Sequence, residues 1–93
     1  MSVKEYMQQD KYDYTWKRDK GDGSYRGYLD RIKVDKDEGY EVKEFIEEFI
    51  KKHNLDTTKS NVRAIEDALH LPKYSDVVSR EKLMQSLAKD FDL

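Results

Sequence analysis

A stretch of apolar residues with helical spacing, from Tyr40 to His53, limits the folds open to this chain more than anything else in the sequence. The apolar side chains recur at intervals of three and four residues: Val42, Phe45, Ile46, Phe49 and Ile50. A helix with about 3.6 residues per turn places such side chains on one side, and charged residues fill the other side. The sequence therefore predicts an amphipathic helix over 40–53, which must bury its apolar side against another element.

The sequence also predicts ion pairs on the surface of this helix and the residue at which the helix ends. Glu47 and Glu48 each lie four residues before a lysine, Lys51 and Lys52. Glutamate four residues before lysine is a favourable arrangement on a helix surface, so two ion pairs are expected. Asn54 follows the last turn and is a residue type that commonly stops a helix.

Two shorter helices are expected in the second half of the chain, over about 61–70 and 79–91, from the same apolar spacing. Ser60 and Ser79 are the expected N-caps, because a serine hydroxyl can accept a hydrogen bond from the first free backbone amides. The pair Leu71-Pro72 is the expected end of the first of these helices, since the residue before proline avoids helical backbone angles.

Aromatic residues alternate with polar ones near the N-terminus, where Tyr12, Tyr14 and Trp16 are each separated by one residue. This period of two is typical of a strand that carries all three rings on one face. Turn residues over 19–24, two of them glycines, precede a second extended run. The pattern predicts an antiparallel β-hairpin over about 11–34, with a third short strand at Tyr40–Lys43 as the alternative to the start of the helix.

Together these elements predict an α+β fold, in which the hairpin packs against about three helices. With 93 residues, the chain is expected to form one small domain over 1–93. Only 37% of the residues are hydrophobic and 41% are charged, so its core must be thin. The aromatic content of 12% and the net charge of -2 nevertheless favour a folded chain over a disordered one. A homodimer that buries additional apolar surface and a monomer both stay open.

Several kinds of chemistry lack the residues they need. The chain has no cysteine, which excludes disulfides, thiolate metal sites and thiol catalysis. Its two histidines, His53 and His70, lie near no catalytic or metal-binding motif, and no phosphate-binding glycine loop occurs. We therefore expect no enzyme, no metal and no cofactor, and an enzyme built on the two histidines is the weakest hypothesis.

The location of the protein is predicted from what the sequence lacks. No apolar run approaches the roughly 18 residues of a membrane span, and the first residues lack the apolar region of a secretion signal. We expect a cytoplasmic protein that does not contact a membrane.

The strongest functional signal is acidic. Residues 35–48 carry seven acidic and two basic side chains, a local charge of -5. Such a surface can attract a basic partner and steer its association, although most charge runs are simply solvated helix faces. The leading hypothesis is a non-enzymatic protein-interaction module, a small modulator or inhibitor that binds a basic protein, with nucleic-acid-binding proteins as one class of candidate partner. The expected contact residues are Asp35, Asp37, Glu38, Glu41, Glu44 and Glu48.

The alternative hypothesis is binding of single-stranded nucleic acid. Aromatic rings that stack on bases, next to cations that contact phosphates, are the usual means of such binding. The residues of the expected hairpin that fit this chemistry are Tyr12, Tyr14, Trp16, Lys17, Arg26 and Tyr28. Packing of the same rings in the protein core is the competing interpretation, because so short a chain has few other large side chains to bury.

Overall fold

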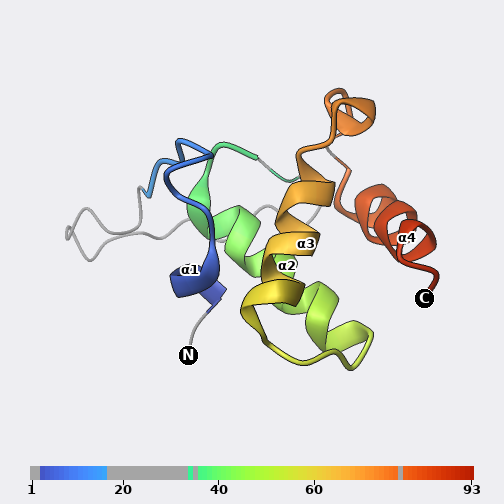
Figure 1. Ribbon diagram of the computed structural model, residues 1–93. Helices are drawn as coiled ribbons and strands as arrows, with labels where there is room; N and C mark the ends of the chain where they lie inside the picture. Colours follow the sequence, from blue (N-terminus) through green and yellow to red (C-terminus); the bar gives the residue numbers. More distant parts are fainter. Residues whose placement is uncertain (1–2, 17–33, 35, 78) are drawn as a thin grey trace, which may run out of the picture.

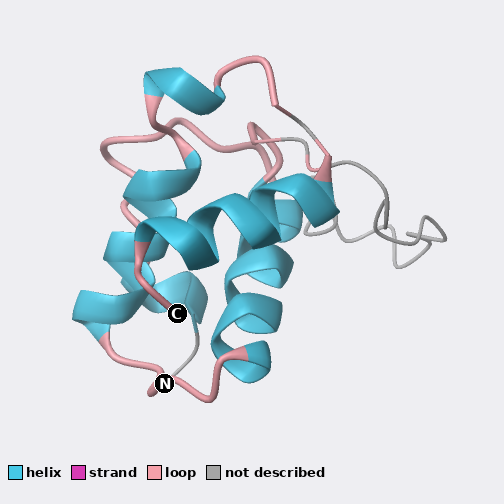
Figure 2. Cartoon of the chain, turned by 90° about the vertical axis from the view of Figure 1, so that its right-hand side faces the viewer, coloured by secondary structure: helices cyan, strands magenta, loops and turns pink. Residues whose placement is uncertain are grey.

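The computed structural model describes residues 3–16, 34, 36–77 and 79–93. These ranges contain four α-helices and a short 3-10 helix (Figure 1): α1 (Val3–Tyr6), α2 (Gly39–Lys52), α3 (Lys59–Leu69), η2 (Pro72–Tyr74) and α4 (Arg80–Asp90). α2 and α3 pack against each other, α1 contacts both of them, and α4 packs against α3. Loops alone join these helices in the described part of the chain (Figure 2).

The apolar stripe of α2 forms the centre of the core. Val42, Phe45, Ile46 and Phe49 are fully buried, and Ile50 is nearly so. The other buried side chains of this core come mainly from α3 and α4, and also from Val3 and Met7 near the N-terminus and Val34 before α2: Val62, Ile65, Leu69, Leu83, Leu87, Val3, Met7 and Val34. Helical periodicity thus corresponds directly to burial along α2.

The helix ends follow local rules, with one difference from expectation. Asn54 adopts a left-handed backbone with φ of 55° just after α2, a conformation that asparagine tolerates better than most residues. Ser79 caps α4 by accepting a hydrogen bond from the amide of Lys82. The cap of α3 is Thr58 rather than Ser60, because the Thr58 hydroxyl accepts from the amide of Asn61 and the helix begins earlier than expected.

The prediction of an α+β fold is wrong for the described residues, which contain helices and no strand. Residues 11–16 belong to the expected hairpin but form only an isolated bridge, in which the Thr15 amide donates to Asp37 and the Gly39 amide donates to Thr15. The rest of that hairpin, residues 17–33, lies outside the described residues. The alternative third strand at Tyr40–Lys43 is also wrong, since these residues form the first turn of α2.

The error has a physical cause. Alternation indicates an extended backbone with its rings on one side, but it does not identify what those rings pack against. In the structure, the Tyr14 and Trp16 rings pack on the helical core. The helices thus partly bury the aromatic side of the segment for which alternation predicts a sheet.

Candidate functional site

Among the expected acidic contact residues, Glu38 and Glu48 have defined contacts within the fold. Glu38 is the N-cap of α2 and accepts a hydrogen bond from the Tyr40 amide at 3.4 Å. Glu48 forms an ion pair with Arg80 at 2.6 Å, which links α2 to the first residue of α4. Substituting either residue would therefore disturb the fold as well as the surface.

The other expected acidic residues lie at or near the start of α2. Asp37 is exposed, and Glu41 and Glu44 are half-buried. Glu41 and Glu44 are three residues apart, so they share one side of the helix. Asp35 lies outside the described residues. We call Asp37, Glu41 and Glu44 the acidic face.

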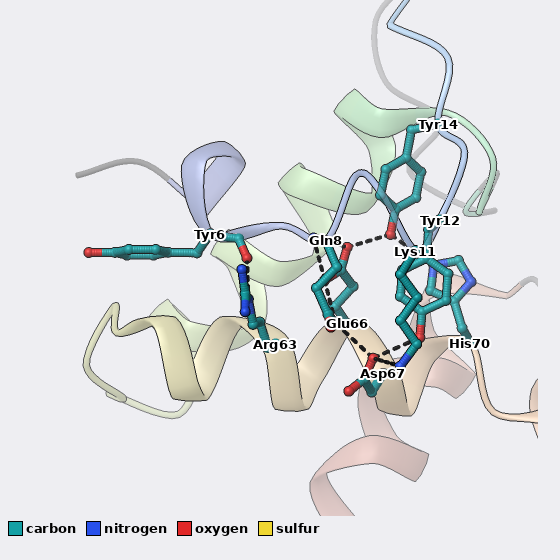
Figure 3. Close-up of polar contacts among 9 residues, drawn as sticks. All are labelled: Tyr6, Gln8, Lys11, Tyr12, Tyr14, Arg63, Glu66, Asp67 and His70. Carbon is teal, nitrogen blue, oxygen red and sulfur yellow. Dashed lines mark hydrogen bonds and ion pairs between the residues drawn. The ribbon is translucent and has the colours of Figure 1, made fainter.

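A second group of polar residues, which the sequence analysis missed, surrounds a carboxylate in the interior (Figure 3). Glu66 on α3 is fully buried, with 0% of its surface exposed. Its two oxygens accept from the backbone amide of Gln8 at 2.9 and 3.1 Å, and Oε1 also accepts from the Gln8 side chain at 3.0 Å. The Tyr14 hydroxyl donates to Oε2 at 2.7 Å. A buried carboxylate requires such donors, and those that the described residues provide come from Gln8 and Tyr14.

Asp67, the next residue of α3, binds the same segment nearer the surface. Its Oδ1 accepts from the Tyr12 hydroxyl at 2.7 Å, the Gln8 side chain at 2.8 Å and Lys11 Nζ at 3.2 Å. Burial alone would raise the pKa of Asp67, but the hydrogen bonds from Tyr12, Gln8 and Lys11 outweigh it and hold the pKa below its ordinary value of 3.8. Asp67 therefore stays ionised and retains these donors at neutral pH.

His70 closes this group at the end of α3. Its Nε2 lies 2.9 Å from the Tyr14 hydroxyl, and its ring stacks on Tyr12 with 4.0 Å between centroids. Because Tyr14 gives its single hydroxyl proton to Glu66, we assign the proton of this second bond to His70 Nε2. Burial lowers the pKa of His70, against the opposing effect of Glu66, so the ring is neutral at pH 7.

We call Glu66, Asp67, His70 and the side chains that contact them the polar anchor. Its seven residues are Gln8, Lys11, Tyr12, Tyr14, Glu66, Asp67 and His70. Arg63 adds a further contact one turn earlier on α3, where its Nε donates to the Tyr6 carbonyl at 3.0 Å. Burial and the bond to Glu66 raise the pKa of Tyr14, so its hydroxyl remains a donor. With the Glu66 carboxylate fully buried and hydrogen-bonded, the anchor is suited to holding the N-terminal segment on α3.

A sequence signal for the anchor did exist. Glu66 lies four residues after Val62 and three before Leu69, on the apolar stripe of α3. An acidic residue on an apolar stripe is buried, so its carboxylate must accept hydrogen bonds from nearby donors. The sequence of one helix does not show which residues provide those donors.

The two histidines do not form a common site. His53 follows α2 and packs against Phe49, with 4.7 Å between ring centroids. His70 follows α3, at the other end of that helix from the loop that connects it to α2 (Figure 1). The described residues also contain no group of three or more His, Cys, Asp or Glu side chains that could hold a metal ion.

The aromatic residues of the nucleic-acid hypothesis are engaged within the molecule. The Trp16 ring packs edge-on against Tyr40, with 4.9 Å between ring centroids. Lys4 Nζ lies 4.4 Å from the centroid of the Trp16 ring. Tyr12 and Tyr14 belong to the polar anchor. Lys17, Arg26 and Tyr28 lie outside the described residues. No observation on the described residues favours base stacking by these rings.

Comparison with protein-family models, curated proteins and solved structures gives no match to this chain. Within the described ranges, no helix has both the length and the apolar character needed to cross a membrane.

Proposed function

We propose that this chain is a protein-interaction module, a small modulator or inhibitor that binds a basic partner protein through the acidic face of Asp37, Glu41 and Glu44. The supporting observation is that these carboxylates stand on a rigid support. Val42 and Phe45, the neighbours of Glu41 and Glu44 in sequence, are fully buried in the core. The helix backbone that carries Glu41 and Glu44 is therefore fixed before a partner arrives, and less backbone entropy is lost on binding.

Charge supports the same conclusion. Residues 35–48 have a net charge of -5, although the whole chain has only -2. A concentrated negative potential speeds the approach of a basic protein and selects against acidic ones. Binding of this kind weakens as salt is added, because ions screen charges at the surface.

The test is capture of partner proteins from a lysate of the host organism, with the double variant Glu41→Lys/Glu44→Lys beside the wild type. Glu38 and Glu48 are left unchanged because they cap α2 and bind Arg80. The matched control reverses two exposed acids away from α2, Asp10→Lys/Asp56→Lys.

We expect the wild type and the control to retain the same basic protein at low salt, and the Glu41/Glu44 variant to lose it. Circular dichroism of all three proteins shows whether each is folded. Equal capture of that protein by a folded Glu41/Glu44 variant would contradict the proposal.

A further inference from the structure

An open cavity of about 600 Å³ lies between the second half of α2 and the first turns of α4. This volume falls within the roughly 300–1,000 Å³ of small-molecule sites. The lining residues are Glu48, Lys51, Lys52, Arg80, Glu81 and Met84. The cavity is separate from the acidic face, because none of Asp37, Glu41 and Glu44 lines it.

Two lysines at this cavity lack the carboxylates that the helix pattern predicts for them. Glu47 instead pairs with Lys43 at 3.1 Å, and Glu48 pairs with Arg80 at 2.6 Å. No ion pair joins Lys51 or Lys52 to any other described residue, and both side chains are exposed. Their positive charge is therefore available to a bound anion.

The remaining walls set the charge and shape of the cavity. The Arg80 side chain is only 8% exposed, and its ion pair with Glu48 is neutral as a unit. The described lining then retains two lysines and Glu81, a net charge of +1. α4 also begins at this wall, and the positive end of its dipole favours negative charge.

Met84 adds an apolar surface to the lining. Methionine is flexible and polarizable, so it packs against apolar groups of varied shape. We infer that this cavity binds a small organic molecule that carries an oxyanion, a carboxylate or a phosphate, next to a short apolar portion. The oxyanion lies near Lys51 and Lys52, and the apolar portion lies on Met84.

The test is an NMR titration of the full-length ¹⁵N-labelled protein at constant ionic strength. The probes are sodium hexanoate, inorganic phosphate and uncharged 1-hexanol. We expect hexanoate, phosphate or both to produce saturable shifts at the amides of 48–52 and 80–84, with 1-hexanol much weaker. Hexanoate should bind more tightly than inorganic phosphate, because phosphate has no apolar portion to pack on Met84. If neither anion gives saturable shifts there, or if 1-hexanol matches hexanoate, the inference is wrong.

Three variants locate the charge that matters. Lys51→Gln/Lys52→Gln should weaken anion binding about tenfold, equivalent to about 1.4 kcal/mol. Glu81→Gln should strengthen it, because the carboxylate repels an anion in the same cavity. The control Lys59→Gln/Lys89→Gln removes two exposed lysines elsewhere and should leave the affinity unchanged. Equal affinities for the wild type and the Lys51/Lys52 variant would also overturn the inference.

Discussion

Removal of the Glu66 carboxylate should strongly destabilise the fold. In Glu66→Ala, the backbone amide of Gln8 and the hydroxyl of Tyr14 lose the acceptors that now lie 2.7–3.1 Å away. The Gln8 side chain keeps Asp67 as its acceptor. The principal cost is therefore that of two part-buried donors without partners.

The magnitude follows from these contacts. A buried donor left without an acceptor costs about 1–3 kcal/mol. Tyr14 can recover part of this cost by donating to His70 Nε2, if the imidazole proton moves to Nδ1. We expect Glu66→Ala to lower the free energy of unfolding by about 2–4 kcal/mol, a large fraction of the roughly 5–15 kcal/mol of a typical domain.

The assay is urea unfolding followed by circular dichroism, with Glu66→Ala, Tyr14→Phe and the double variant forming a thermodynamic cycle. The coupling between the two sites should be at least about 1 kcal/mol, because both substitutions remove the same hydrogen bond. Glu47→Ala is the matched control, since its carboxylate forms only a partly exposed pair with Lys43. Exposed pairs contribute about 0–1 kcal/mol. A loss below about 1 kcal/mol in Glu66→Ala, or no coupling with Tyr14, would refute this account of the anchor.

Three further substitutions test other contacts. Gly39→Ala should destabilise the protein by about 1–3 kcal/mol and shift Trp16 fluorescence, because an added Cβ would lie 2.4–2.5 Å from three atoms of the indole ring. Unchanged or higher stability would contradict this close packing. Ser79→Ala should cost about 1 kcal/mol in urea unfolding, since it removes the cap that accepts from Lys82, and a loss near zero would count against that cap. Burial lowers the pKa of His70, so the neutral ring is favoured in the folded state and stability should fall as the pH drops below the unfolded value of 6.5. Urea unfolding at pH 7 and pH 5.5 should show a smaller pH effect in His70→Gln, and an equal effect would rule out this contribution.

The helices were predictable because their signals are local. The spacing of Val42, Phe45 and Phe49 sets which side of α2 is buried, whatever packs against it. Asn54 and Ser79 likewise act within one turn of their own positions. Such features require no knowledge of the tertiary structure.

The contacts between distant segments were not predictable in the same way. Alternation around Tyr14 indicated extended backbone, but the partner of that segment is a carboxylate 52 positions later, at Glu66. Glu48 illustrates the same limit, because its expected partner Lys52 is replaced by Arg80 from α4. In both cases the sequence shows a group that needs a partner, and only the fold determines which partner it has.

We propose that the acidic face of Asp37, Glu41 and Glu44 forms the contact with a basic protein. The most direct test of this proposal is the dissociation constant of the captured partner at low and physiological salt, for the wild type, Glu41→Lys/Glu44→Lys and Asp10→Lys/Asp56→Lys. We predict binding at least about tenfold weaker in the Glu41/Glu44 variant, near wild-type binding in the control, and weaker binding of the wild type as salt rises. Equal dissociation constants for all three proteins, or binding of the wild type that does not depend on salt, would contradict it.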